Sequence, residues 1–404
     1  MRVVVAGASV AGVAACAALR GAGYDGGVVL LGDESHVPYD RPPLSKQLLC
    51  GTLNVDDIVL PAAPRLGELD VDWRAGIGAR GLDLASRTLS LDDGTRLGFD
   101  GLIIATGSRA RRLPDQPVAE GLFVLRTLDD ALALRAAVSR AAHVVVVGAG
   151  FIGLEVASSA RSLGVRATVL ETAGAPMTRA LGPELGGWFS ELHADHDVDI
   201  RCGVTVRRVR VEDGRVTGVE ISHAGGDARP LDADVVVVGV GAAPCTAWLR
   251  DSGLGIDDGV VCDATLKAAS GVYAAGDVAR WHHPGYGSIR VEHWTTAGYH
   301  GRTAASNLAA ELDGRRGERL EADEIPYFWS DQHETKIQMA GWVPGYDQVE
   351  VLPAPKGRAV LFGRRGRLVG VMAWNQPALV ARQRRAMASP TSFEAAVAAA
   401  GDGR

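Results

Sequence analysis

A glycine-rich turn with the spacing of a dinucleotide-binding motif lies close to the first residues of the sequence. In "RVVVAGASVAGVAACAAL", an apolar run is followed by Gly7, Ser9 and Gly12. In such a βαβ unit the first position makes the tight turn, the second lets the backbone approach a pyrophosphate, and the third lets the following helix pack on the strand. Ser9 departs from glycine, but its small side chain should admit a pyrophosphate and could hydrogen-bond to it. After the next apolar run, Asp33 and Glu34 are placed to accept hydrogen bonds from a ribose.

A second turn repeats the pattern in "HVVVVGAGFIGLEVASSARSLGVRATVLE", where it is completed by Gly148, Gly150 and Gly153. One such turn alone could be a small-residue turn of any α/β protein. Two complete turns in one chain are much harder to explain in that way. Glu171 ends the next apolar run, and an acid there favours NADH because it would repel the extra phosphate of NADPH. Two dinucleotides in one chain suggest a flavin and a nicotinamide that exchange hydride.

The composition suits a protein of two or three domains with large cores. The chain has 404 residues, of which 47% are hydrophobic, and its net charge of -6 argues against a general nucleic-acid binder. The apolar opening has glycines at strand-to-helix spacing, unlike a signal peptide, and we expect no membrane association. The cysteines are scattered without zinc or disulfide spacing, so we expect no metal site and a reducing cytoplasm. They are Cys16, Cys50, Cys202, Cys245 and Cys262.

The stretch "GDESHVPYDRPPLSKQLL" (32–49) resembles FAD-dependent ferredoxin reductases, which supply electrons to cytochromes P450 and ring-hydroxylating oxygenases. The likeness continues in order through "LIIATGS", "VLRTLDDA", "VVVVGVGAAP", "VYAAGDVA", "VEHWTTAGYHGRTAA" and "PYFWSDQ", and ends near residue 385. It extends more distantly to apoptosis-inducing factor. The resemblance implies an α/β fold with two Rossmann-like dinucleotide-binding domains and a small α+β C-terminal domain.

This resemblance implies two sets of cofactor-binding residues. The FAD set is Gly7, Ser9, Ala11, Gly12, Asp33, Glu34, Arg41, Lys46, Ala79, Ala105, Thr106, Gly107, Arg126, Gly276, Asp277, Glu292, His293, Trp294 and Trp329. The NADH set is Gly148, Gly150, Phe151, Ile152, Gly153, Glu155, Glu171 and Gly241.

Lys46 and Glu155 are the two residues expected to be catalytic. The resemblance places Lys46 beside the reactive N5 atom of the flavin, and we expect it to form a direct salt bridge with Glu155 in the first turn of the second motif's helix. The alternatives are a surface-loop lysine and a glutamate that complements the N-terminus of its own helix. Arg41 could hold the FAD pyrophosphate.

Other FAD contacts have plainer alternatives. Asp277 is expected on the ribityl chain, although it could also be a turn or N-cap aspartate. Arg126 could instead form a salt bridge between domains. The resemblance places Glu292, His293, Trp294 and Trp329 along the isoalloxazine, with His293 in a binding role, although a tryptophan is more commonly a core residue. Because "FWSDQ" is hydrophilic on one side, we do not expect a plain strand there.

The cysteine pattern bears on the electron acceptor. Disulfide reductases of this architecture carry a C-x4-C pair, whereas Cys50 stands alone here, so dithiol exchange lacks its second sulfur. We expect Cys50 to be a small buried hydrophobe. Electrons would then pass singly to a separate iron–sulfur ferredoxin, of the 2Fe-2S type, because the chain has no cysteine set for a cluster of its own. Basic patches could steer an acidic ferredoxin: Arg109/Arg111/Arg112, Arg364/Arg365/Arg367 and Arg382/Arg384/Arg385.

Two rival functions remain open from the sequence. One is an NADH oxidase, or a peroxide or disulfide reductase, that uses Cys50. The other is an NADH-sensing flavoprotein that signals through a conformational change. The sequence does not identify the ferredoxin, the oxygenase or the oligomeric state.

The expected FAD domain is discontinuous, with the NADH domain inserted. Its parts are 1–109 and 238–318, the NADH domain is 110–237, and the C-terminal domain is 319–404. The polar stretch 309–324 is expected to be the linker into the C-terminal domain. That domain is expected to hold alternating strands with a hairpin at "GRRGR", then a helix, and a short terminal helix.

Overall fold

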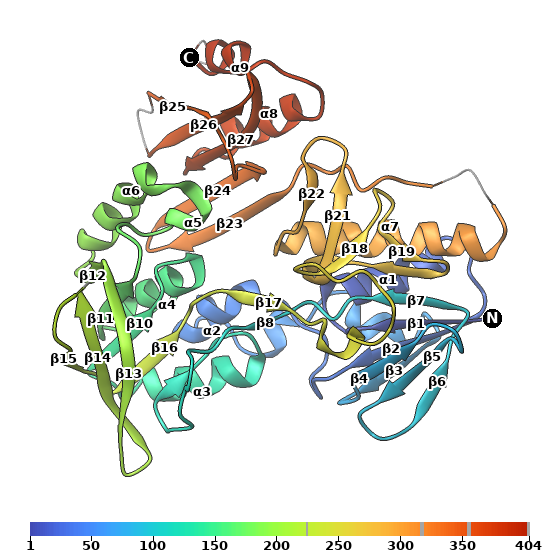
Figure 1. Ribbon diagram of the computed structural model, residues 1–404, viewed down its shortest axis with the longest axis horizontal. Coiled ribbons are helices and arrows are strands. Elements are labelled where there is room, and N and C mark those ends of the chain that lie inside the picture. Colours follow the sequence, from blue (N-terminus) through green and yellow to red (C-terminus); the bar gives the residue numbers. More distant parts are fainter. Residues whose placement is uncertain (224, 316–318, 354–356, 402–404) are drawn as a thin grey trace. The chain divides into compact units, whose positions relative to one another are not determined.

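The computed structural model describes residues 1–404 except 224, 316–318, 354–356 and 402–404, and the chain separates into two compact units (Figure 1). The first unit comprises Met1–Asp40, Ile58–Arg109 and Ala243–Phe328. The second unit comprises Arg41–Asp57, Ala110–Ala242 and Trp329–Arg404. The proline-rich segment that follows Asp40 therefore groups with the second unit.

The first unit is built on a six-stranded sheet in the order β19-β20-β7-β1-β2-β3. All neighbouring strands in it are parallel except β19 and β20. The inner strands are continuous apolar runs because both faces of the sheet are covered. The strands are β1 (Arg2–Ala6), β2 (Gly27–Gly32), β3 (Val71–Ala75), β7 (Gly101–Ile104), β19 (Lys267–Ala269) and β20 (Val272–Ala274).

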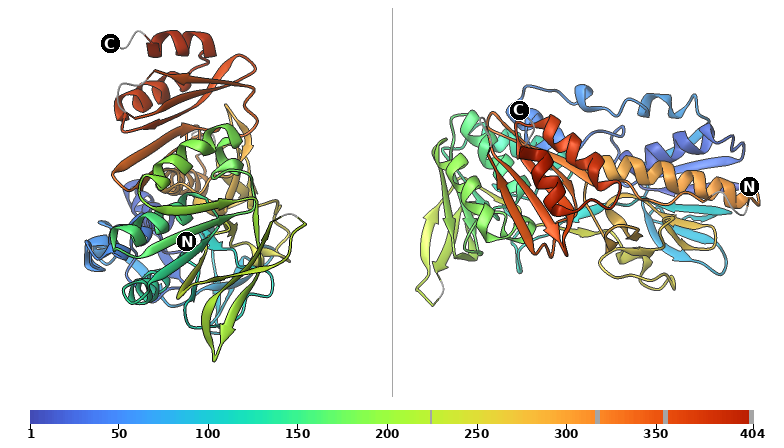
Figure 2. Two further views of the ribbon diagram at one scale, coloured as in Figure 1. Left: turned by 90° about the vertical axis from the view of Figure 1, so that its left-hand side faces the viewer. Right: turned by 90° about the horizontal axis from the view of Figure 1, so that it is seen from above.

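Two helices of the first unit, α1 (Val10–Gly21) and α7 (Trp294–Leu312), lie side by side (Figures 1 and 2). Gly301 makes the close approach possible, because a Cβ atom there would lie 2.2 Å from the carbonyl oxygen of Ala11. Two three-stranded sheets complete the unit. They are β4 (Ala79–Asp83), β5 (Thr88–Leu91) and β6 (Arg96–Gly98), and β18 (Val260–Cys262), β21 (Ala279–His283) and β22 (Gly287–Ile289).

The second unit contains a parallel five-stranded sheet in the order β12-β11-β10-β16-β9. Its strands are β9 (Leu122–Phe123), β10 (His143–Val147), β11 (Arg166–Glu171), β12 (Val198–Cys202) and β16 (Val235–Val238). The associated helices are α2 (Gln47–Cys50), α3 (Leu128–Val138), α4 (Phe151–Ser162), α5 (Thr178–Leu181) and α6 (Pro183–Ala194). A three-stranded sheet of β13 (Val204–Glu212), β14 (Arg215–His223) and β15 (Arg229–Asp232) adjoins it.

The C-terminal part of the second unit is a five-stranded sheet in the order β23-β24-β27-β26-β25. Its strands are β23 (Tyr327–Gln332), β24 (Thr335–Gly341), β25 (Gln348–Leu352), β26 (Ala359–Arg364) and β27 (Arg367–Trp374). The helices α8 (Pro377–Met387) and α9 (Phe393–Gly401) follow. The predicted hairpin is confirmed: Arg365 and Gly366 both have positive φ, as a two-residue turn between right-twisted strands requires.

Two sequence-based expectations are corrected. The stretch "FWSDQ" does form a strand, β23, because its polar residues Ser330 and Gln332 are buried rather than exposed. Gln332 Nε2 donates to Ser330 Oγ, and both residues have further hydrogen-bond partners outside the strand. The expected linker 309–324 begins too early, since α7 continues to Leu312. Beyond the helix, Ala322 is hydrogen-bonded to the backbone of Ala264 and to the side chain of Trp281.

Candidate functional site

The first glycine turn is tightly packed at its first and third positions, where the motif predicts close backbone contacts. Gly7 has φ +120° and a Cβ there would lie 2.1 Å from the oxygen of Ala105, while a Cβ on Gly12 would lie 1.8 Å from the oxygen of Gly7. Ser9 is the N-cap of α1 and makes no side-chain capping bond. The turn therefore presents the N-terminus of α1, a favourable site for a pyrophosphate, beside a hydroxyl that does not cap the helix.

Further FAD-set residues follow the carboxyl ends of the neighbouring strands. Thr106, which follows β7, donates to the oxygen of Cys245 at 3.0 Å. Asp277, which follows β20, accepts from Ser108 Oγ at 2.9 Å, and Gly276 before it has φ +76°. Ligands of open parallel sheets bind at this edge. The structure thus brings Ala105, Thr106, Gly107, Gly276 and Asp277 to the same edge as the first turn.

The acidic pair beyond β2 divides into two environments. Glu34 is half-buried and accepts from the hydroxyl of Tyr39 at 2.5 Å, whereas Asp33 is exposed. Ala79, another FAD-set residue, is half-buried at the first position of β4. Sequence analysis did not include Tyr39, although an aromatic residue in a proline-rich loop was a usable signal.

The N-terminus of α7 carries three more FAD-set residues. His293 is the N-cap, and burial of its ring lowers its pKa to about 4, so it is neutral near pH 7. Its Nδ1 is inaccessible and has no hydrogen-bond partner among the described residues, which fits a polar group of a bound cofactor. Trp294 donates to Asp40 Oδ1 at 2.6 Å, and burial raises the pKa of Asp40. Glu292 is exposed and pairs with Arg290.

The second glycine turn is also tightly packed at its first and third glycines, whereas its middle glycine has free space around it. A Cβ on Gly148 would lie 2.4 Å from the oxygen of Gly239, and one on Gly153 would lie 2.1 Å from the oxygen of Gly148. A Cβ on Gly150 would meet nothing within 4 Å. The middle position therefore has the room that a pyrophosphate would need.

The residues around this turn include the predicted acid. Glu171 ends β11 and accepts from the backbone nitrogens of Ala149 at 2.8 Å and Ala173 at 2.9 Å. Thr172 Oγ1 also donates to Glu171 Oε1 at 3.2 Å. The carboxylate is thus held against the turn, and roughly one of its four lone-pair sites is left for a ribose. Ile152 is largely exposed at the start of α4, and Gly241, exposed with φ +102°, follows β16. Phe151 packs edge-on against Phe189.

The predicted Lys46–Glu155 salt bridge is confirmed within the second unit. Lys46 Nζ lies 3.0 Å from Glu155 Oε1, and both side chains are buried. Glu155 is the fifth residue of α4, so it lies in the second turn of the helix rather than the first. Its remaining partners are the hydroxyls of Ser45 and Ser330, both from outside the helix. A buried ion pair of this kind is retained when every charge is hydrogen-bonded, and breaking one typically costs about 3–5 kcal/mol.

The two serines were missed by sequence analysis. Ser330 lies far from Glu155 in the chain, so no local spacing links them. Arg41, Arg126 and Trp329 are half-buried residues of the second unit, and their assignment to FAD stays a prediction.

Cys50 is not the buried residue that we expected. It is half-exposed because α2 is a single turn that ends at Gly51 in the left-handed conformation. Its Sγ lies 3.7 Å from Ser162 Oγ, and none of the five cysteines is joined in a disulfide. Burial raises the pKa of both Cys16 and Cys262 to about 12, which makes these thiols inert.

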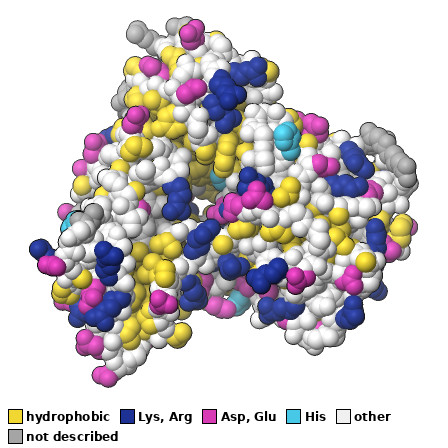
Figure 3. Space-filling model, in the orientation of Figure 1, with side chains coloured by type: hydrophobic (Ala, Val, Ile, Leu, Met, Phe, Trp, Pro, Cys, Tyr) yellow, Lys and Arg dark blue, Asp and Glu magenta, His cyan; other side chains and the backbone are white. Residues whose placement is uncertain are grey.

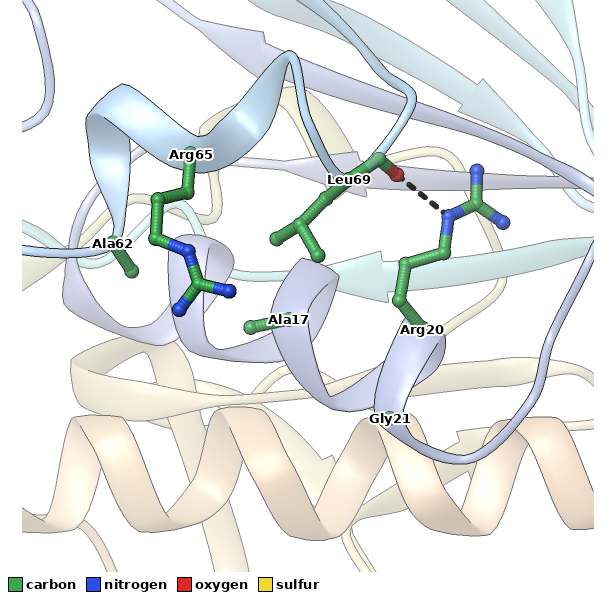
Figure 4. Close-up of a pocket in the computed structure, with 6 residues that line it drawn as sticks. All are labelled: Ala17, Arg20, Gly21, Ala62, Arg65 and Leu69. Carbon is green, nitrogen blue, oxygen red and sulfur yellow. Dashed lines mark hydrogen bonds between the residues drawn. The ribbon is translucent and has the colours of Figure 1, made fainter.

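A hollow of about 380 Å³ in the first unit lies beside the C-terminal part of α1 (Figure 4). It is lined by Ala17, Arg20, Gly21, Ala62, Arg65 and Leu69. Arg20 donates to the oxygen of Leu69 at 2.8 Å and to three further backbone carbonyls, so its guanidinium holds the loop together. None of the cofactor-set residues lines this hollow.

Two glycine turns at the carboxyl edges of two largely parallel sheets indicate a protein that binds two dinucleotides, as an oxidoreductase that pairs a flavin with a nicotinamide does. The comparisons agree with this class. The family described as pyridine nucleotide-disulphide oxidoreductase matches residues 1–301, and the reductase C-terminal family matches residues 327–402. The chain belongs to the pyridine nucleotide-disulphide oxidoreductase family.

Named relatives are reductases of oxygenase systems. The chain is 36% identical over 383 residues to rhodocoxin reductase of Rhodococcus erythropolis, covering 93% of this chain and 87% of that protein. It is 36% identical over 399 residues to the ferredoxin reductase component of a chlorobenzene dioxygenase from Cupriavidus sp. (strain PS12), covering 98% and 94%. The covalent putidaredoxin reductase–putidaredoxin complex matches with a TM-score of 0.90 at 29% identity, covering 99% of each chain. The resemblance inferred from the motifs is confirmed.

Among the described residues, no helix is long and apolar enough to cross a membrane. Within that same part of the chain, no group of three or more metal-binding side chains is gathered.

Proposed function

We propose that the protein is an FAD-dependent NADH:ferredoxin reductase that supplies a cytochrome P450 or a ring-hydroxylating oxygenase. The observation that carries the proposal is the buried Lys46–Glu155 pair in a chain with two dinucleotide turns and no disulfide among its five cysteines. The names of the relatives support it, since they are reductases of such systems.

The FAD would be held by the first turn, by Glu34 and by the residues after β7 and β20. The assignment of Arg41, Arg126 and Trp329 to FAD is part of the proposal. FAD accepts a hydride and passes the electrons on one at a time. The NADH would be held by the second turn, where Glu171 accepts from its ribose hydroxyls and Gly150 admits its pyrophosphate. The domain boundaries at 109, 237 and 318 are part of the proposal.

Lys46 and Glu155 would act as a unit in this reaction. The ammonium of Lys46 supplies a positive charge that stabilises the negative charge gained when the cofactor is reduced. Glu155 holds that ammonium in place, and the two serine hydroxyls hold Glu155. We expect Lys46→Ala to slow reduction by NADH and to lower the potential of the flavin, while the FAD content falls only modestly. Reduction at the wild-type rate would contradict this role.

The electron acceptor would be a separate 2Fe-2S ferredoxin in the cytoplasm, where free cysteines persist. Ferredoxins are acidic, so a basic surface would steer their association. Figure 3 shows lysine and arginine side chains over α8, the helix that carries Arg382, Arg384 and Arg385. The other two arginine groups stay candidates for the same role.

The test measures NADH oxidation with cytochrome c, with and without an added 2Fe-2S ferredoxin. Turnover that depends on ferredoxin supports the proposal. Consumption of dioxygen or peroxide without ferredoxin, lost in Cys50→Ser, would support the oxidase or peroxidase alternative. A slow, long-lived reduced complex without transfer would support the signalling alternative.

A further inference from the structure

A chain of polar side chains in the second unit connects Glu155 to a group of histidines. Ser330 Oγ donates to Glu155 Oε1 at 2.7 Å, and Gln332 Nε2 donates to Ser330 Oγ at 3.0 Å. His193 Nε2 lies 3.0 Å from Gln332 Oε1, and His333 Nε2 lies 3.3 Å from His193 Nδ1. Ser330, Gln332 and His193 are all at most 1% exposed. This chain leads outward from the buried ion pair.

The direction of every hydrogen bond in this chain follows from its members. Gln332 Oε1 is only an acceptor, so the proton of neutral His193 must lie on Nε2. Nδ1 of His193 is then an acceptor, and His333 must donate to it. The amide of Gln332 is oriented in turn by its donation to Ser330, whose own proton points to Glu155. All four bonds therefore donate toward Glu155.

The surroundings keep the two inner histidines neutral. Burial lowers the pKa of His193 to about 4, and burial with the neighbouring His193 and His196 lowers the pKa of His333 to about 3. The outer end is different: His196 stacks on His333 with ring centroids 3.8 Å apart, and its Nε2 lies 3.0 Å from Glu334. A positive charge would thus be held on His196 beside Glu334, at the outer end of the chain, while His193 and His333 carry no charge.

The groups that face Glu155 come from two elements other than its own helix. Lys46 and Ser45 lie at the end of the short 3-10 helix Pro42–Ser45, Ser330 lies on β23, and Glu155 itself lies on α4. A carboxylate has roughly four lone-pair sites, and three of them are used here. Since Ser45 is adjacent to Lys46 in the chain, the bond from Ser330 is the independent constraint on where the carboxylate points.

We propose that Ser330, Gln332 and His193 are positioning residues that hold Glu155 against Lys46, and that this chain of hydrogen bonds fixes the proton of His193 on Nε2. The inference deepens the proposed function and rests on it for its kinetic part. Its structural part is the single tautomer of His193, which can be measured without FAD or NADH and does not depend on the proposed function.

The first experiment is nitrogen NMR of the protein labelled in its histidines, which distinguishes protonated from bare ring nitrogens. We expect His193 near pH 7 to carry its proton on Nε2 only. Ser330→Ala should abolish this preference, because the amide of Gln332 loses the acceptor that orients it. Ser330→Thr keeps the hydroxyl and should restore the wild-type spectrum. The control is Ser222→Ala, which removes a buried serine hydroxyl whose only side-chain partner among the described residues is Arg207, and which should change nothing at His193.

The second experiment is rapid-mixing reduction of the FAD-loaded protein by NADH. Ser330→Ala should lower the limiting rate about tenfold, the lower end of what one hydrogen bond to a charged group contributes, while the dissociation constant of NADH stays unchanged. Ser330→Thr should recover the rate, and Gln332→Leu, which removes the next link at similar volume, should lower it in the same direction.

The outcomes separate this inference from the proposed function. A wild-type protein that NADH does not reduce would overturn the function and leave the NMR result to judge the hydrogen-bond chain. A wild-type protein that is reduced normally, with Ser330→Ala equal to it in both rate and His193 tautomer, would overturn the inference alone. A mixed tautomer of His193 in the wild type would also overturn it.

Discussion

The two glycine turns share one packing constraint but differ where a ligand would lie. In both, a Cβ on the third glycine would overlap a carbonyl oxygen of the first, at 1.8 Å for Gly12 and 2.1 Å for Gly153. The middle positions differ, with Ser9 in the first turn and the open Gly150 in the second. The comparison teaches that the outer glycines serve the fold of each βαβ unit, while the middle position is set by the ligand.

The acids of the two units are also held differently. Glu34 is bound by the side chain of Tyr39 from the following loop, whereas Glu171 is bound by the backbone of its own turn. A ligand at the second turn would therefore depend on an acid that also orders the turn itself. Substitution of Glu171 should therefore affect both the order of its turn and ligand binding, whereas substitution of Glu34 should affect mainly ligand binding.

The largest expected effect is at the third glycine of each turn. Gly12→Ala and Gly153→Ala should each destabilise the protein by about 1–3 kcal/mol or more, because the new Cβ overlaps backbone that has no room to move. Urea unfolding of the purified variants measures this. Gly150→Ala is the matched control and should stay within about 0.5 kcal/mol of wild type, while its affinity for NADH falls. A Gly150→Ala protein as unstable as Gly153→Ala would contradict the inference that the outer glycines serve the fold and the middle position serves the ligand.

The outer glycines were predictable because the motif is local: strand, turn and helix are adjacent in the chain. The Lys46–Glu155 pair was also predictable, through the resemblance. Its support by Ser330 was not, since that contact joins positions 175 residues apart and leaves no periodic signal. The strand β23 was mispredicted because a polar run suggests exposure, whereas Ser330 and Gln332 are buried by bonding to one another and to partners from other elements.

The next effect in size concerns the acid of the second turn. Glu171→Ala should weaken NADH binding about ten- to a hundredfold and reduce discrimination against NADPH, because a charge-assisted pair of bonds worth roughly 1.5–3 kcal/mol is lost. Steady-state kinetics with both nucleotides measures it. Glu34→Ala is the counterpart in the first unit and should lower FAD retention instead. A wild-type preference for NADPH would show that Glu171 does not play this role.

Both units bury neutral histidines, and these make stability depend on pH. Burial lowers the pKa of His300 in the first unit to about 3 and that of His193 in the second to about 4. A depressed folded pKa contributes stability above the unfolded value near 6.5 that is lost as pH falls toward the folded value. The thermal midpoint should therefore drop between pH 7 and pH 5. His196, whose pKa is raised, opposes this, but it is only half-buried.

A variant in the first unit sharpens that expectation. Both ring nitrogens of His300 lack partners among the described residues, so His300→Leu breaks no bond that the structure shows. The variant should reduce the drop in midpoint between pH 7 and pH 5 while keeping the stability at pH 7. An unchanged drop would show that His300 does not carry the pH dependence.

The smallest expected effect is at Cys50, which lies close to the helix of the second turn. Its Sγ contacts Ser159 and Ser162 on α4, and no second cysteine pairs with it, so it has no partner for dithiol exchange. A serine at this position keeps the size and a polar atom at a half-exposed site, and surface substitutions of this kind usually change stability by less than about 0.5 kcal/mol. Cys50→Ser should therefore retain ferredoxin-coupled turnover within about twofold, measured as NADH-dependent reduction of cytochrome c through the ferredoxin. A loss of more than about tenfold with FAD still bound would instead make Cys50 the reacting group, and the thiol-based alternative would then replace ferredoxin reduction.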